Sequence, residues 1–213
     1  MTRPLVITDC DEVLLHMVGP FRDWLGEAHG VNFDMASENF ARAMTHVHNG
    51  DPVSEEEIWR LLNLFFDGQM YRQYPIPGAI EAMTELARHA DVVVLTNLKH
   101  HRNAHRTKQL ADLGLDLRVF TNQGPKGPPL KAILDEYRPS RAVFIDDLAV
   151  HHGSVFECAP EVGRLHFCGE PLLSPNIACA HKAGHAHARI DDWASAVPWL
   201  LDRLHEENVS SAT

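Results

Sequence analysis

The chain has 213 residues, of which 45% are hydrophobic and 23% are charged, a balance that is ordinary for a globular protein. This length fits one large domain or one domain with an insertion. The formal net charge of −10 repels nucleic acid and anionic membranes, so we expect a small-molecule substrate and neither nucleic acid nor a membrane as partner.

We expect neither a targeting signal nor a membrane anchor. No apolar run reaches the length of a membrane span, and residues 1–4 lead straight into a short apolar run rather than into a signal peptide. The four cysteines have no CxxC spacing, which predicts reduced thiols rather than a zinc ribbon or a redox motif. The 15 histidines are partly clustered, as at His151 and His152, and we interpret this as surface clustering. We therefore expect a cytoplasmic protein.

Short β-rich runs alternate with helical stretches along most of the chain. The first strand is predicted at 5–8, and later strands at 91–96, 117–121, 142–145 and 162–167; helices are predicted at 78–89, 99–113, 129–137, 150–158 and 192–204. This order predicts an α/β fold with a Rossmann-like parallel sheet and helices on both faces. Right-handed crossovers would bring the strand C-termini to one edge, where open α/β sheets bind ligands.

One long segment interrupts the alternation. Roughly eighty residues separate the first strand from the next, far more than a crossover needs. Helices are predicted within them at 20–29, 35–44 and 54–66, and Ser54 with Glu57 fits a capping box. We expect an inserted helical cap at 19–74 on a core formed by 1–18 and 75–205, with a flexible tail at 206–213. A cap of this kind implies an enclosed site.

Asp9 and Asp11, directly after the first apolar run, carry the strongest functional signal. In a strand, side-chain direction repeats every second residue, so the two carboxylates would point the same way. Like charges this close are costly unless a cation shares them or one keeps its proton. The pair predicts a metal-bound nucleophile beside a proton carrier; the alternative is that either residue caps a turn.

Polar residues follow two later strands as well. The run 92–95 leads to Thr96 and Asn97, a hydroxyl and an amide that can bond a phosphoryl oxygen. The run 143–145 leads to Asp146 and Asp147, hard oxygen ligands of the type that Mg²⁺ prefers. Lys126 lies in a Gly- and Pro-rich loop before a helix, where an ammonium can neutralise transferring charge. Each signal alone could be a cap or a surface charge, but their order favours a phosphate site.

These residues resemble the four motifs of the haloacid dehalogenase-like hydrolase superfamily, whose members are mostly phosphatases. The matching stretches are 6–14 (VITDCDEVL), 94–97 (VLTN), 126–129 (KGPP) and 144–147 (FIDD), and the resemblance spans about residues 5–170. Two departures stand out. Glu12 takes a position where many relatives have glycine, and Lys131 competes with Lys126 for the third motif.

The resemblance implies a Mg²⁺-dependent phosphohydrolase that acts on a small phosphorylated metabolite through an aspartyl-phosphate intermediate. Asp9 would be the nucleophile, and Asp11 the general acid and base whose backbone carbonyl joins the metal shell. The other implied roles are phosphoryl binding by Thr96 and Lys126, support of Asp9 by Asn97, and metal binding by Asp147 with Asp146 beside it. Charge balance also favours a cation, because four carboxylates would otherwise repel one another and the phosphate.

Two other functions stay open. A metal-independent haloacid dehalogenase would use a similar aspartate to displace halide, although those relatives generally lack the second aspartate that Asp11 provides. A catalytically silent relative would act as a binding protein, and the extra negative charge of Glu12 keeps that alternative open. Phosphonate hydrolysis is disfavoured because 19–74 contains no lysine.

Overall fold

The computed structural model describes residues 2–37 and 42–205. Its centre is a six-stranded sheet in the order β10-β9-β8-β1-β6-β7, and all of its pairings are parallel. The strands are β1 (Leu5–Thr8), β6 (Asp91–Thr96), β7 (Arg118–Thr121), β8 (Ala142–Asp146), β9 (Gly163–His166) and β10 (Ala188–Arg189). The first five confirm the predicted strands to within one residue at each end. The two-residue β10 is too short to give a sequence signal.

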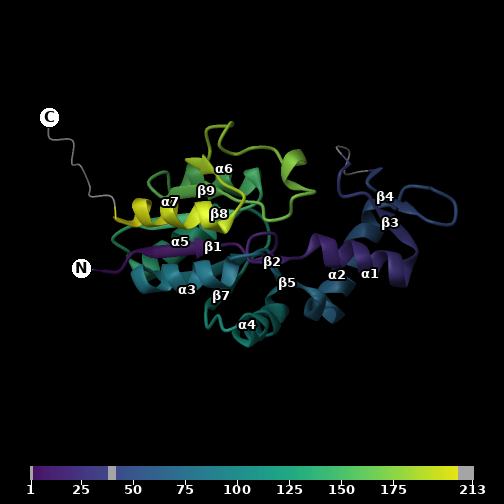
Figure 1. Cartoon of the computed structure of the whole chain (residues 1–213), viewed down its shortest axis with the longest axis horizontal. Helices are drawn as coiled ribbons and strands as arrows, with labels where there is room; N and C mark the ends of the chain where they lie inside the picture. The colour runs from purple at the N-terminus through teal and green to yellow at the C-terminus, as the bar shows by residue number, and fades with distance from the viewer. Residues whose placement is uncertain (1, 38–41, 206–213) are drawn as a thin grey trace.

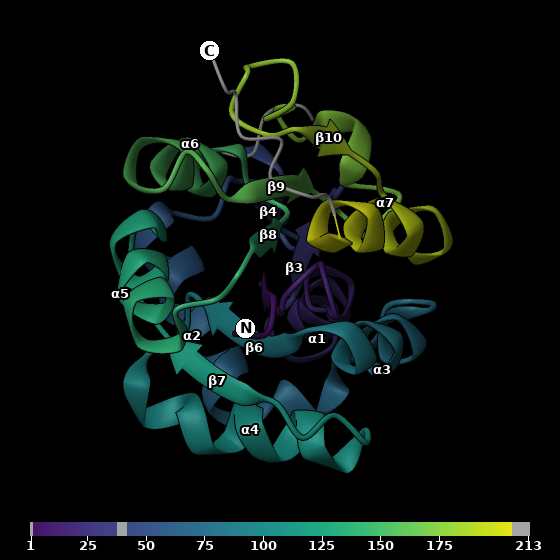
Figure 2. The same ribbon diagram turned by 90° about the vertical axis from the view of Figure 1, so that its left-hand side faces the viewer.

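Helices cover both faces of this sheet (Figure 2). They are α3 (Ala79–His89) and α7 (Trp193–His205) on one face, α5 (Gly127–Tyr137) and α6 (Ala149–Cys158) on the other, and α4 (Asn103–Asp112), preceded by the short η3 (His100–Arg102), beside β7. The alternating side-chain direction along β1 explains why a helix layer packs on each face of the sheet. Val6 packs in the apolar cluster that contains α3 and α7, whereas Leu5 and Ile7 pack in the cluster that contains α5 and α6. The predicted Rossmann-like α/β sheet is confirmed.

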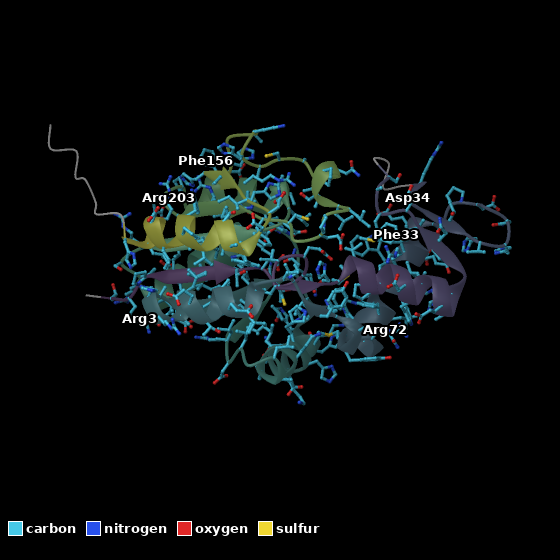
Figure 3. All side chains as sticks on the ribbon, viewed as in Figure 1. Arg3, Phe33, Asp34, Arg72, Phe156 and Arg203 are labelled. Atoms are coloured by element: carbon cyan, nitrogen blue, oxygen red, sulfur yellow. The ribbon has the colours of Figure 1, made fainter. Side chains whose placement is uncertain are left out.

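Between β2 (Leu15–His16) and β5 (Tyr74–Pro75) the chain leaves the sheet and forms a further apolar cluster, on the right of Figure 1. The elements of this segment are α1 (Val18–His29), the hairpin β3 (Val31–Phe33) and β4 (Met44–His46), α2 (Glu55–Gly68) and η2 (Met70–Arg72). Because β2 and β5 pair antiparallel, the two passages of the chain into and out of this segment lie side by side. Figure 3 shows Phe33 and Asp34 at this end of the molecule, opposite Arg3 and Arg203.

The inserted segment differs from the predicted set of three helices in one place. The helices α1 and α2 confirm those predicted at 20–29 and 54–66, and Ser54 Oγ accepts the Glu57 N–H at 3.2 Å, as in a capping box. The helix predicted at 35–44 is wrong at both of its described ends, because residues 35–36 form a turn and Met44 begins β4, where it pairs with Phe33. Gly30, at φ 59°, terminates α1 in the left-handed region, and the following residues alternate between buried and exposed, which favours a hairpin.

Some sequence predictions fall outside this description. Residues 38–41, within the predicted 35–44 helix, and the predicted tail at 206–213 lie outside the described residues. The division into a core of 1–18 and 75–205 and a cap of 19–74 stays a prediction. Among the described residues, no helix combines the length and apolar character that crossing a bilayer requires.

Candidate active site

The C-terminal ends of β1, β6 and β8 meet at one edge of the sheet. β1 lies between the other two strands, with Thr8 opposite Val94 of β6 and Ile145 of β8. Beyond this register the polar residues follow, and the Asp9 N–H donates to the Ile145 carbonyl at 2.8 Å. The structure therefore brings Asp9, Thr96 and Asp146 together, and all three are buried.

Lys126 is the cation at the centre of this group. Its Nζ lies 2.8 Å from Asp9 Oδ1 and 2.6 Å from Asp146 Oδ2, and its side chain is fully buried. Burial acts to lower the pKa of Lys126, but the two carboxylates outweigh it and raise the pKa, so the ammonium stays charged. Lys131, the competing residue for the third motif, is exposed on α5.

Close packing of α5 against α6 fixes the loop that carries Lys126. Lys126 is the residue before the first turn of α5, and the Gly127 N–H donates to Ser154 Oγ at 3.0 Å. A Cβ at position 127 would lie 2.3 Å from the Ser154 carbonyl oxygen, so only glycine allows this approach. Gly127 therefore allows the close helix packing that holds Lys126, and with it the ammonium, in position.

Asp9, Asp146 and Asp147 form a buried acidic cluster whose ligand atoms all lie within 4.8 Å of one another. Burial raises the pKa of Asp9, and Asp146 adds to this, although Lys126 acts in the opposite direction. Burial, Asp146 and Asp9 raise the pKa of Asp147 well above its usual value. One ammonium faces three carboxylates, and their oxygens are the hard ligands that Mg²⁺ prefers. The cluster therefore fits a divalent cation.

Two buried histidines hold the backbone of the Asp146-Asp147 turn. His152 Nε2 lies 3.0 Å from the Asp146 carbonyl oxygen, and His166 Nε2 lies 2.8 Å from that of Asp147. Because the Ala180 N–H donates to His166 Nδ1, the His166 proton sits on Nε2. Burial lowers the pKa of His152 to about 3, so that ring is neutral.

The surface interpretation of His151 and His152 is therefore wrong, since both are buried. The sequence did contain a signal for their burial, because both lie in an apolar helix a few residues after Asp146. His166 gave no such signal, because its role depends on the pairing of β8 with β9.

The carboxylate of Asp11 does not join the acidic cluster. It is bound by Arg106 Nη2, at 2.9 Å from Oδ1 and 3.1 Å from Oδ2, and by Gln73 Nε2 at 2.6 Å. The prediction that it points with Asp9 is wrong because β1 ends at Thr8, so the two-residue repeat of a strand does not extend to Asp11. Since both oxygens of Asp11 accept hydrogen bonds here, proton transfer through this group requires their release.

Sequence reasoning missed Arg106, the fully buried partner of Asp11. Its guanidinium also donates to Cys10 Sγ at 3.0 Å. Arg106 lies four residues before Leu110 on the buried face of α4. A charged residue at an apolar-face position was the available signal, because such a residue is rarely buried without a partner.

Thr96 and Asn97 differ in what they offer to a ligand. Thr96 Oγ1 is buried and has no hydrogen-bond partner among the described residues. Asn97 donates from Nδ2 to the Gly124 carbonyl at 2.9 Å, and its Oδ1 accepts from Asn122 at 3.0 Å. Asn97 therefore braces the loop before Lys126, rather than Asp9 as predicted, and Thr96 is the free donor of the pair.

Glu12 occupies the left-handed region at φ 58°, a strained conformation for a residue with a side chain. Its Oε1 accepts the N–H groups of Met17 at 2.8 Å and Val18 at 2.6 Å, where α1 begins. Burial raises the pKa of Glu12 to about 7, although these two hydrogen bonds act in the opposite direction. Glu12 thus supports the start of the inserted segment and is not a member of the acidic cluster of Asp9, although its charge helps to raise the pKa of Asp147.

A cavity of about 320 Å³ lies beside the site, between α2 and the loops that follow β6 and β7. Its lining includes Trp59 and Phe66 from α2 and Asn97, Lys99 and Gly124 from the loops. The cavity therefore has an apolar wall from the inserted segment and a positive charge from the sheet edge, a combination that suits a small anion with an organic part.

No family model matches the sequence, and no curated protein is significantly similar to it. Solved structures, however, share its fold. One is a conserved haloacid dehalogenase-like protein of unknown function from Agrobacterium tumefaciens, with 17% identity, a TM-score of 0.67, and coverage of 95% of this chain and 99% of that one. Another is a proposed phosphoglycolate phosphatase from Lactobacillus plantarum, with 14% identity, a TM-score of 0.60, and coverage of 93% and 99%. A third is an L-2-haloacid dehalogenase, with 10% identity, a TM-score of 0.60, and coverage of 93% and 99%. The chain therefore has the haloacid dehalogenase-like fold.

Proposed function

We propose that the protein is a Mg²⁺-dependent phosphohydrolase of the haloacid dehalogenase-like superfamily, acting on a small phosphorylated metabolite. The observation that carries this proposal is the arrangement around Asp9. One of its oxygens is held by Lys126 and by the Cys10 N–H, at 2.8 and 2.7 Å, beside the unpartnered hydroxyl of Thr96. Phosphoryl transfer needs this combination of a fixed nucleophile and donors for the transferring oxygens.

The reaction would begin at Asp9. Because the donors hold Oδ1, Oδ2 is the attacking atom: it forms a bond to phosphorus while the bond to the ester oxygen breaks. Thr96 would donate to a phosphoryl oxygen, and Lys126 would offset the growing negative charge. Water then attacks the phosphorus of the aspartyl-phosphate, which releases inorganic phosphate and restores Asp9.

Asp11 would give its proton to the leaving oxygen and later take one from the water. Since Arg106 and Gln73 bind its carboxylate, this role requires both contacts to open when the substrate enters. Gln73 directly precedes β5, the strand through which the chain returns from the inserted segment. Movement of that segment would therefore open the Gln73 contact, whereas Arg106, on α4, would have to shift separately.

The acidic cluster would hold the Mg²⁺ ion. Asp146 Oδ2 is already paired with Lys126, and its Oδ1 accepts the Leu148 N–H at 2.9 Å, so Asp147 is the most available ligand, and Asp9 would have to share Oδ1 between the ion and Lys126. The ion would supply further neutralisation of the phosphoryl charge. Asp146 would then act mainly by fixing Lys126.

A metal-independent dehalogenase is the second candidate, and the Arg106–Asp11 pair favours it. Asp11 was the residue that argued against this function, yet its carboxylate is occupied here. In that reaction Asp9 Oδ2 would attack carbon and displace halide, and water would hydrolyse the resulting ester. One of the structural neighbours is itself an L-2-haloacid dehalogenase.

The test is to assay wild type, Asp9→Asn and Asp202→Asn for phosphate release from a panel of phosphate monoesters, with Mg²⁺ or with a chelator. Asp202 is an exposed aspartate on α7 and serves as the matched control. We expect Mg²⁺-dependent phosphate release by wild type and Asp202→Asn and a loss of at least about 10³-fold in Asp9→Asn. Halide release from 2-haloacids with a chelator present would instead support the dehalogenase. Inertness of all three proteins in both assays would support the binding-protein alternative.

A cytoplasmic location is part of the same proposal. All four cysteines are free thiols, as a reducing compartment favours. The net charge of −10 also supports a small substrate over a polyanionic one.

A further inference from the structure

A second cluster of metal-binding side chains lies apart from the acidic cluster of Asp9. Among the described residues, Glu12, His16 and Glu170 bring two carboxylate oxygens and a ring nitrogen within 4.8 Å of one another, and all three residues are buried. Glu12 follows β1, His16 belongs to β2, and Glu170 lies in the loop after β9. We propose that these three side chains bind a divalent transition-metal ion of the zinc class, which ties β2 to the core.

Each carboxylate in this cluster is anchored through one oxygen and presents the other. Glu12 Oε1 accepts the two N–H groups at the start of α1, and Glu170 Oε1 accepts the Leu172 N–H at 3.0 Å. The free oxygens face the same atom, since His16 Nδ1 lies 3.9 Å from Glu12 Oε2 and 3.3 Å from Glu170 Oε2. Backbone anchoring of this kind orients a carboxylate before an ion arrives.

Two of the converging atoms are orphaned. Glu12 Oε2 and His16 Nδ1 are buried, on side chains that are only 3% and 9% exposed, and neither makes a well-aligned hydrogen bond among the described residues, although His16 Nδ1 lies within ion-pair distance of Glu170 Oε2. An unpaired buried polar group costs about 1–3 kcal/mol. An ion between these atoms would satisfy both at once, which makes it the natural occupant of the cluster.

The spacing also suits a small ion. Ligand atoms at about 2.0–2.1 Å from a tetrahedral zinc ion are about 3.3–3.4 Å apart. The distance from His16 Nδ1 to Glu170 Oε2 meets this value, and that to Glu12 Oε2 requires a shift of roughly half an ångström. Three protein ligands with an open fourth position also match zinc sites that keep a water molecule.

The donor set separates this cluster from the acidic one. A neutral imidazole with two carboxylates suits zinc and its transition-metal neighbours, whereas Mg²⁺ prefers oxygen alone. Burial lowers the pKa of His16, which favours the neutral ring that a metal ion needs, although Glu170 acts in the opposite direction. The Tyr74 ring, with its centroid 4.9 Å from that of His16, packs beside the imidazole.

A proton is the competing occupant. A proton on His16 Nδ1 could form a hydrogen bond with one carboxylate oxygen and would leave the other with no partner. A divalent ion reaches all three ligand atoms. Binding of the ion would affect the junction between the core and the inserted segment, because β2 and β5 carry the chain into and out of that segment. The ion would hold this junction against the loop after β9.

The experiment measures Zn²⁺ binding to the full chain after chelator treatment, with excess Mg²⁺ present throughout. The variants are His16→Gln, Glu170→Gln, Asp147→Asn and, as a matched control, His181→Gln from the histidine-rich loop near the C-terminus. We expect one equivalent of tightly bound Zn²⁺ in wild type, Asp147→Asn and His181→Gln. In His16→Gln and Glu170→Gln the affinity should fall by at least about 100-fold.

A second readout covers variants that fold poorly. Co²⁺ bound to wild type should give a visible spectrum that His16→Gln changes and His181→Gln does not. Zinc binding that survives both His16→Gln and Glu170→Gln, or that only His181→Gln removes, would overturn the proposal. An absence of zinc binding in wild type would overturn it as well. Asp147→Asn separates the result from the phosphohydrolase proposal, because it removes a ligand of the acidic cluster and none of the three proposed zinc ligands, although Asp147 lies within electrostatic reach of Glu12.

Discussion

Replacing Lys126 with Met tests the electrostatic centre of the candidate site. Lys126 is fully buried and paired with Asp9 and Asp146, so its removal leaves two carboxylates in the interior without their ammonium. Breaking a buried ion pair from one side costs about 3–5 kcal/mol. Domains are stable by about 5–15 kcal/mol, so we expect the variant to fold but to lose a large part of its stability.

The measurement is urea denaturation with a chelator present, so that no cation replaces the ammonium. With a urea m-value of about 2–3 kcal/mol/M, the midpoint should fall by about 1–2 M. The loss should be smaller in acid. Burial already raises the pKa of Asp9, and removal of Lys126 raises it further. A carboxyl group whose pKa is higher in the folded than in the unfolded state destabilises the protein when the pH is above the folded-state pKa. At a pH below the unfolded-state pKa the group is protonated in both states, and this destabilisation disappears.

The double variant Lys126→Met/Asp146→Asn is the internal control. It removes a charge from each side of the pair, so its stability should recover part of the single variant's loss. Turnover should fall by at least about 10² in both variants, because the donor to the transferring group is gone. A loss under about 1 kcal/mol at pH 8 in the single variant, or no recovery in the double variant, would refute this account of the buried pair.

Two further variants test other parts of the site. Asp11→Asn should lower kcat by about 10²–10⁴ and leave Mg²⁺ affinity nearly unchanged, because the Asp11 carboxylate lies outside the acidic cluster; steady-state kinetics with a Mg²⁺ titration checks this, and an unchanged kcat would remove its acid-base role. His152→Gln should weaken the pH dependence of stability: burial lowers the pKa of His152 to about 3, so below pH about 6.5 the unfolded chain binds a proton that the folded chain does not. Wild type should therefore lose about 1.4 kcal/mol per pH unit through this group as pH falls, and chelator-treated protein unfolded at pH 7 and pH 5 should show a smaller change in the variant. Equal pH dependence in the two proteins would contradict the buried neutral ring.

Local sequence pattern was enough for the sheet and its helices. The continuous apolar runs at 92–95 and 143–145 are typical of strands covered on both faces, and the parallel order with right-handed crossovers predicted that their C-termini meet at one edge. The same reasoning predicted Asp9, Thr96, Lys126, Asp146 and Asp147 as site residues, since each ends or follows a strand or precedes a helix. Their burial and mutual distances are properties of the assembled edge.

Long-range contacts decided the partners of the site residues and the hairpin of the inserted segment. Asp11 pairs with Arg106, 95 residues away, and His166 reaches the Asp147 carbonyl only because β9 lies against β8. Neither partner can be identified from local periodicity, because a buried charge is compensated by whatever residue the fold brings near it. The hairpin β3–β4 was missed for a related reason. Short strands are specified mainly by their cross-strand partner, whereas the C-terminus of α1 is marked by Gly30 and the N-terminus of α2 by Ser54.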